Sequence, residues 1–153
     1  MIYLDQSIVT PLKAAVEKTA EESCGFLFGS DLDTHRIIST IMEVDNDSFD
    51  RRRTFRISPR NYMKAENYAA CNNLQMLGIF HSHPDSPAIP SEFDRVAAQP
   101  YFSYLILSVM NRKMTDMRSW SLKNNLQFEE ETLTVLNINQ HVYGYRNNPY
   151  PAA

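Results

Sequence analysis

The segment 76–94 constrains the fold more than any other part of this 153-residue chain. Its first part, MLGIFHSH, is an apolar run of strand length, and a loop with three prolines follows it. The segment ends in SEFD, where Ser91 and Asp94 have the spacing of a helix capping box. We therefore expect a strand, a stiffened loop and a capped helix in this order. Residues 76–82 are predicted to be a central strand of the sheet, and His81 and His83 lie at its carboxyl end, where active sites of such folds are often found.

The rest of the chain alternates between helical stripes and short apolar runs. Helices are predicted over 6–20 and from 59 to about 73, the second with Ser58 as N-cap before a proline at the first helical position. Further strands are predicted over 24–29, 36–44, 54–58, 104–110, 118–123, 126–131 and 133–138. This order indicates an α/β fold, in which a single-domain mixed β-sheet with mostly antiparallel pairs at its ends is sandwiched by helices.

Length and charge limit the possible classes of protein. One domain over 1–138 is expected, followed by a C-terminal tail over 139–153 that has no clear period and is expected to be partly disordered. The net charge of −3, from 15 basic and 18 acidic residues, argues against a general nucleic-acid binder. No apolar run approaches the roughly 20 residues that span a bilayer, and no signal peptide is visible, so a cytoplasmic protein without a membrane partner is expected. The oligomeric state stays open.

Two smaller features have mainly structural interpretations. Arg51–Arg53 is the one basic cluster and is interpreted as a solvated loop, with contact to an acidic partner surface as the second interpretation. The chain has two cysteines and no CxxC pair, and two cysteines are too few for a disulfide framework or a cysteine-only zinc site. Cys24 is interpreted as a small buried hydrophobic residue.

His81, His83 and Asp94 are candidate metal ligands. Residues i and i+2 of a strand point to the same face, so the two imidazoles can be aimed at one point. Two histidines and one carboxylate make three protein ligands and leave a fourth position for water, which is the pattern of a catalytic zinc site. The alternative is structural: the histidines belong to the core, and the carboxylate serves only the capping box.

Two motifs carry a family resemblance. HSHPDSPAIPSEFD matches His-x-His-Pro-x6-Ser-x2-Asp, the signature of the JAMM (MPN-plus) metalloprotease family, at every defined position. Upstream, EESCGFLFG resembles the Glu-x-Cys-Gly-x-Leu-x-Gly strand of the same family, and the resemblance covers about residues 5 to 135. The chain therefore resembles a compact prokaryotic member of this family. The resemblance implies the MPN architecture, which is similar to that of cytidine deaminases.

The resemblance also implies roles for individual residues. One zinc ion per chain would be bound by His81, His83 and Asp94. Glu22 would be the general base that takes a proton from water and passes it to the leaving amine. Ser91 would stabilise the oxyanion of the tetrahedral intermediate with its hydroxyl group. Whether the same hydroxyl can also cap the helix is left open by the sequence.

The implied reaction is hydrolysis of a peptide or isopeptide bond after the Gly-Gly tail of a ubiquitin-like or sulfur-carrier protein, which would bind as an extended strand. Which carrier is the substrate stays open. One alternative is a non-catalytic MPN scaffold or binding module. Another is a RadC-like DNA-associated protein, which has the same histidine, serine and aspartate pattern but fits poorly with the net charge. A zinc nucleobase deaminase would need Pro-Cys-x-x-Cys, which the chain lacks.

Overall fold

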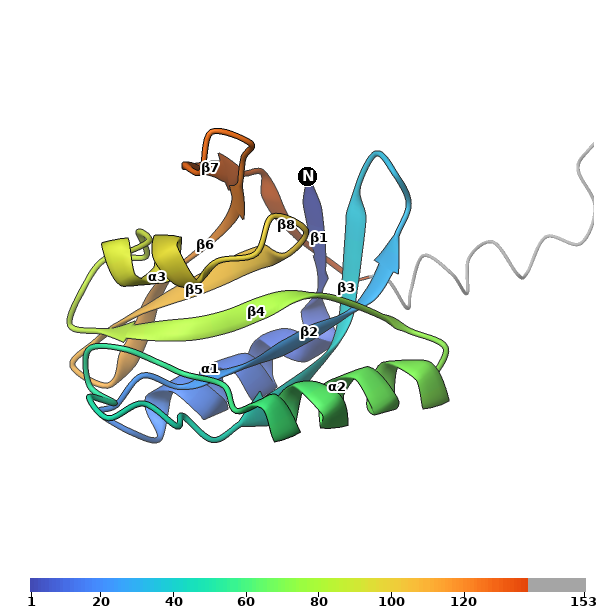
Figure 1. Ribbon diagram of the computed structural model, residues 1–153. Coiled ribbons are helices and arrows are strands. Elements are labelled where there is room, and N and C mark those ends of the chain that lie inside the picture. Colours follow the sequence, from blue (N-terminus) through green and yellow to red (C-terminus); the bar gives the residue numbers. More distant parts are fainter. Residues whose placement is uncertain (138–153) are drawn as a thin grey trace, which may run out of the picture.

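The computed structural model describes residues 1–137, so the predicted tail over 139–153 lies outside the described residues (Figure 1). The elements in chain order are β1 (Ile2–Asp5), the 3₁₀ helix η1 (Gln6–Ile8), α1 (Val9–Glu17), β2 (Cys24–Asp31), β3 (Arg36–Val44), α2 (Pro59–Cys71), β4 (Gln75–Pro84), α3 (Glu92–Ala97), β5 (Ser103–Met110), β6 (Lys113–Leu122), β7 (Phe128–Glu131) and β8 (Leu133–Leu136). Within residues 1–137, no helix has the length and apolar character needed to cross a membrane.

The strands form one mixed sheet in the order β7-β6-β5-β4-β2-β3-β1-β8. β4 is the fourth of these eight strands, which confirms the predicted central strand. It pairs antiparallel with β2 and parallel with β5, and α3 lies on the crossover between the two parallel strands. The expected antiparallel pairing at the sheet ends is correct for β6 and β7 but wrong for β1 and β8, which are parallel.

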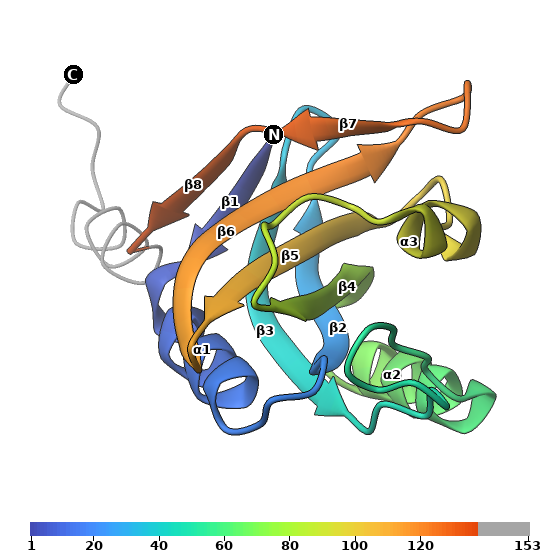
Figure 2. The ribbon, with the colours of Figure 1, turned by 90° about the vertical axis from the view of Figure 1, so that its left-hand side faces the viewer.

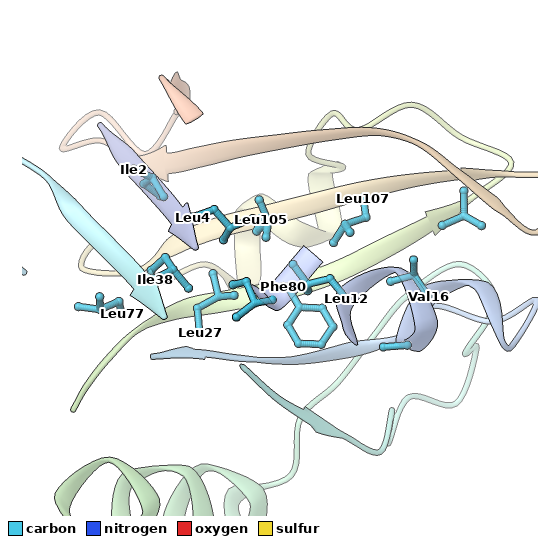
Figure 3. Packing of buried hydrophobic residues seen from close by; sticks show 13 residues of the cluster. Ile2, Leu4, Leu12, Val16, Leu27, Ile38, Leu77, Phe80, Leu105 and Leu107 are labelled. Atoms are coloured by element: carbon cyan, nitrogen blue, oxygen red, sulfur yellow. The ribbon is translucent and has the colours of Figure 1, made fainter. Parts of the chain in front are cut away.

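Helices cover both faces of the sheet because the central strands are apolar on both faces. Alternate residues of these strands point to two separate hydrophobic cores. Figure 3 shows the first core, in which strand leucines pack against Leu12 and Val16 of α1. The second core joins Ala65 and Ala69 of α2 to Phe26, Phe28, Ile79 and Tyr104 of the sheet. This arrangement confirms the predicted α/β sandwich.

One extended segment, 128–136, connects the two ends of the sheet. Its first part is β7, which pairs with β6, and its second part is β8, which pairs with β1. Between them, the Thr132 carbonyl oxygen accepts a hydrogen bond of 2.8 Å from the backbone N–H of Ile2. The strongly curved sheet is visible in Figure 2, where β8 lies beside β1. The two ends of the strand order are therefore joined through a single piece of chain.

One strand was predicted wrongly, and one was missed. Residues 54–58, predicted as a strand, are extended but pair with no neighbouring strand of the described chain. Phe55 and Ile57 are buried there in alternation, which is the pattern that the prediction used, yet Arg56 bonds through its N–H to the side chain of Asn46 and through its carbonyl oxygen to the N–H of Asp47. β1 was not predicted at all, because four residues carry too little periodicity.

Gly25 of β2 lies where its neighbours leave no room for a side chain. A Cβ atom at this position would overlap the carbonyl oxygen of Met42, on the neighbouring strand β3, and the ring of Phe80. We expect Gly25→Ala to lower the free energy of unfolding by about 1–3 kcal/mol, because the paired strand cannot move away without losing its hydrogen bonds. Denaturant unfolding measures this effect, with Ser30→Ala at an exposed position of the same strand as control. Equal unfolding midpoints for the two variants would contradict the packing described.

Candidate active site

The end of β4 places two histidines on one face of the sheet. His81 and His83 alternate with Ser82 and lie on the same face as Ile79, which belongs to the core beneath α2. Ser82 points to the other face, where its Oγ accepts a hydrogen bond of 2.8 Å from the backbone N–H of Ser23. Both histidines are buried. The sequence prediction that the two imidazoles share a face is therefore correct.

The capping box of α3 holds Asp94. The backbone N–H of Ser91 donates to Asp94 Oδ2 at 2.8 Å, and the backbone N–H of Asp94 donates to Ser91 Oγ at 3.1 Å. The predicted capping box is thus present. It leaves the Asp94 carboxylate turned towards the histidines and buried. The structural and the metal-binding interpretation of this motif are compatible, because the cap orients the carboxylate that the cluster needs.

Three potential ligand atoms converge at this point. Nε2 of His81 lies 3.0 Å from Nε2 of His83, and the two nitrogens lie 3.3 and 3.2 Å from Asp94 Oδ2. A tetrahedral zinc ion with bonds of about 2.0–2.1 Å holds its ligand atoms about 3.3–3.4 Å apart. The three separations therefore fit three corners of such a tetrahedron closely. All three side chains are buried, so the group could hold one metal ion.

The hydrogen-bond chemistry of the cluster also fits a cation. His83 Nδ1 lies 2.9 Å from the carbonyl oxygen of Pro87, which can only accept, so this nitrogen carries a proton. Nε2 of the neutral ring then presents a lone pair to the Asp94 carboxylate, which is also an acceptor. If no cation lies between these two acceptors, a second proton must bind the ring. Accordingly, although burial opposes it, hydrogen bonds to Asp94 and Pro87 raise the pKa of His83.

Asp94 and His81 show the same electrostatic balance. Burial would raise the pKa of Asp94, but its hydrogen bonds to His81 and His83 hold that pKa well below the usual range. Burial lowers the pKa of His81, which favours the neutral ring that metal binding requires. Phe55 stacks on this ring with the centroids 4.4 Å apart. The segment wrongly predicted as a strand therefore contributes one wall of the cluster.

Glu22 places a second buried carboxylate at the same site. It lies two residues before the start of β2, and its Oε2 atom is buried without a hydrogen-bond partner among the described residues. Burial raises the pKa of this carboxyl group to about 8, and the charge of Asp94 adds to the rise while that of His83 opposes it. A carboxyl group with such a pKa can take up and release a proton near neutral pH.

Asn46 was missed by the sequence analysis, although it organises the loop around Glu22. Its Nδ2 donates to the carbonyl oxygens of Glu22 and Thr54, each at 3.0 Å. Its Oδ1 accepts from the backbone N–H groups of Ser48 and Arg56. The only signal in the sequence was a polar loop, DNDSFD, which does not reveal which of its side chains bonds to the backbone.

One cavity of about 500 Å³ joins the predicted residues. Glu22, His83 and Ser91 line it together with Arg52, Arg53 and part of the proline-rich loop over 84–89. His81 and Asp94 do not line this cavity themselves, but they cluster with His83, which does. The structure thus brings together all five residues that the sequence analysis singled out for metal binding and catalysis.

Cys24 follows Glu22 closely but plays a different part. It is fully buried, as predicted, and its Sγ lies 3.8 Å from the carbonyl oxygen of Val44. Burial raises the pKa of this thiol to about 12. The thiol is therefore protonated at neutral pH and does not supply a thiolate ligand or nucleophile.

Comparisons with known proteins agree with the fold and the motifs. The desampylase of Pyrococcus furiosus is 26% identical over 134 residues, which cover 88% of this chain and 90% of that protein. The solution structure of a Desulfitobacterium hafniense protein matches with a TM-score of 0.79 and 29% identity, covering 89% of this chain and 93% of the other. A Salinibacter ruber protein matches with a TM-score of 0.69 and 26% identity, covering 98% and 95%.

The family comparison covers both sequence motifs. Residues 7–123 match the family described as prokaryotic homologs of the JAB domain. This range includes Glu22, the two histidines of β4 and the capped helix α3, together with both helices that cover the sheet, α1 and α2. The resemblance inferred from the motifs is confirmed, and the chain belongs to the prokaryotic homologs of the JAB domain.

Proposed function

We propose that this protein is a zinc-dependent hydrolase that cleaves a peptide or isopeptide bond after the Gly-Gly tail of a ubiquitin-like or sulfur-carrier protein. One observation carries the proposal. The buried cluster of His81, His83 and Asp94 has the spacing of tetrahedral ligands and shares a cavity with the buried carboxylate of Glu22. A metal site next to a carboxylate of raised pKa is the arrangement that metal-assisted hydrolysis requires.

The similarity to the desampylase supports the choice of substrate class, since that enzyme is named for removing a ubiquitin-like modifier. The match covers nearly the whole of both chains, so it includes the complete site. A tail that ends in two glycines suits the site because glycine allows close approach of the substrate backbone. The cytoplasm is proposed as the place where the protein meets such substrates.

Three residues would hold the metal: His81 and His83 through Nε2, and Asp94 through Oδ2. A zinc ion bound there would supply a Lewis acid, which lowers the pKa of water towards about 7 and polarises a carbonyl group. Phe55 and the Pro87 carbonyl oxygen hold the two imidazoles in place, and the capping box holds the carboxylate. Such fixed neighbours reduce the motion of ligands and keep their geometry suited to the metal.

Glu22 would act as the general base and then as the general acid. Its carboxylate takes a proton from the attacking water and delivers it to the leaving nitrogen. Burial raises the pKa of this carboxyl group and so helps it to hold the proton for the second step, while the charge of a bound cation would act in the opposite direction. The backbone on both sides of this residue is fixed by hydrogen bonds to Arg51 and Asn46, so the carboxylate has a defined position.

Ser91 would stabilise the oxyanion that forms on the substrate carbonyl. Its Oγ accepts a hydrogen bond from the backbone N–H of Asp94, and this contact uses only a lone pair. The hydroxyl proton is still free to be donated, because a hydroxyl group has one donor and two acceptor sites. Capping and oxyanion binding are therefore compatible for the one side chain. Ser91 is exposed and lines the cavity, as a substrate contact must.

The proposal is tested with fusions of a sulfur-carrier protein that ends in Gly-Gly and continues into a short peptide. Wild-type protein loaded with zinc should cut after the second glycine, and a chelator should abolish cleavage, because removing the metal removes the Lewis acid. Mass spectrometry of the new carboxyl terminus measures the position of the cut. Replacing the final glycine by valine serves as the matched substrate control and should lower the rate strongly.

Two results would contradict the proposal. Cleavage of unstructured chains without preference for glycine would indicate a general peptidase. Zinc-loaded protein that cuts none of the fusions but binds a partner would favour the non-catalytic scaffold. The RadC-like alternative would gain support only from specific DNA binding at physiological salt, a measurement that gel shift or fluorescence anisotropy provides.

A further inference from the structure

We propose that Arg52 and Arg53 form a subsite for a carboxylate group on the leaving side of the scissile bond. This inference rests on the proposed function and adds a preference that the function does not require. The two arginines line the same cavity as Glu22, His83 and Ser91. The protein as a whole is acidic, with a net charge of −3, so two adjacent guanidinium groups at the cavity are a local exception.

The backbone of the arginine loop is firmly held, although its side chains are exposed. The carbonyl oxygen of Arg51 accepts a hydrogen bond of 2.8 Å from the backbone N–H of Glu22. The N–H groups of Arg53 and Thr54 both donate to the carbonyl oxygen of Asp50. Together with the contacts of Asn46, these bonds fix the backbone from which the two arginine side chains extend. A fixed loop loses less entropy when it binds a ligand than a mobile loop does.

The guanidinium groups of Arg52 and Arg53 form no ion pair within residues 1–137. Other arginines of the chain do, as Arg36 pairs with Asp31 and Arg95 with Glu92. Unpaired guanidinium groups at the wall of a cavity present planar sets of donors, whose geometry matches a carboxylate. The chemistry of the cavity wall therefore favours a carboxylate ligand.

The position of the loop indicates the side of the bond on which this carboxylate lies. Glu22 must reach the leaving nitrogen to deliver its proton, so the leaving group lies next to Glu22. The arginine loop is hydrogen-bonded to the backbone of the same residue. On the other side of the bond, the proposed substrate has two glycines, which carry no side chain. In a peptide-linked substrate, the nearest carboxylate is therefore in the first residues after the cut.

Two sources of this carboxylate can be distinguished by substrate design. One is the side chain of an acidic residue just after the cut, and the other is the terminal carboxylate of a very short extension. We would compare carrier fusions with Glu, Gln or Lys as the first residue after Gly-Gly, in a long extension with an amidated end. A second set would carry a two-residue neutral extension with a free or an amidated end.

The variant that tests the subsite is Arg52→Gln combined with Arg53→Gln. Arg51→Gln is the matched control, because its side chain is equally exposed and belongs to the same loop but does not line the cavity. For wild-type protein and control, we expect kcat/KM to be about tenfold higher with Glu than with Gln, and lowest with Lys. The double variant should lose this preference while its zinc content stays unchanged. In the wild type, higher ionic strength should weaken the preference.

Either of two results would overturn the subsite. Equal rates for Glu, Gln and Lys, together with equal rates for free and amidated short extensions, would show that no carboxylate is recognised. A preference for a carboxylate that survives in the double variant would place the recognition elsewhere. If the wild type cuts no fusion, the proposed function fails. The subsite is then tested by the binding of the acidic and neutral extension peptides, measured by fluorescence anisotropy. Equal binding by wild type and double variant would then overturn it.

Discussion

Glu22→Gln is expected to lower the rate of cleavage by about 10²–10⁴-fold while the protein keeps its zinc and its fold. Glutamine has nearly the same size as glutamate but cannot take up the proton of the attacking water. The wild-type carboxylate is buried, and its Oε2 atom has no hydrogen-bond partner among residues 1–137. Steady-state kinetics with the Gly-Gly fusion measures the rate, elemental analysis the zinc, and circular dichroism the fold.

Glu21→Gln is the matched control for this experiment. Glu21 is the neighbouring residue of the same type, but it is exposed and does not line the cavity. We expect this variant to retain the wild-type rate. If it were the inactive variant and Glu22→Gln remained active, the assignment of the general base would be off by one residue. Loss of zinc in Glu22→Gln would instead make Glu22 part of the metal site.

Replacing both His81 and His83 by alanine is expected to remove most of the zinc and all measurable cleavage. Of the three proposed protein ligands, the double variant leaves only the carboxylate of Asp94. His35→Ala controls for the loss of a histidine outside the cluster and should retain about one zinc per chain. Elemental analysis of the purified proteins measures the metal, and full zinc retention by the double variant would contradict the site.

Asp94 needs a different substitution, because its side chain also caps α3. Asp94→Asn keeps an oxygen that can accept the hydrogen bond from the Ser91 N–H but loses the negative charge. We therefore expect it to keep the thermal stability of the helix cap better than Asp94→Ala does, while both variants bind zinc more weakly than the wild type. Comparing the two separates the capping role of this carboxylate from its role in binding metal.

The clustering of the three proposed metal ligands could be predicted because these residues lie close together in the sequence. The alternation along β4 and the capping box of α3 are local patterns, and they orient His81, His83 and Asp94 before any long-range contact is known. Glu22 is different, since local chemistry alone does not distinguish it from Glu21. Only its place in the motif that resembles the family selected it as the candidate base. Its burial and its raised pKa depend on the loop over 45–57, which packs against it and whose position the sequence does not reveal.

The parts that escaped prediction depend on distant contacts. The segment over 54–58 has the buried alternation of a strand, but its hydrogen bonds go to Asn46 and to its own loop rather than to a second strand. β1 is too short to show a period, and it is stabilised by two parallel neighbours that come from opposite parts of the chain. Neither pairing leaves a trace in the composition of β1 itself.

The segment over 128–136 has a consequence for how this protein is made. β1 precedes every other described strand in the chain, yet one of its two partners, β8, is the last of them to be synthesised. The rolled sheet therefore cannot close until β8 has been synthesised, and until then β1 keeps an open edge on the side away from β3. Contacts so distant in sequence also slow folding, because a long loop must be ordered before they form. Premature termination before residue 128 would leave both β6 and β1 with open edges, which makes truncated chains natural targets for aggregation or proteolysis.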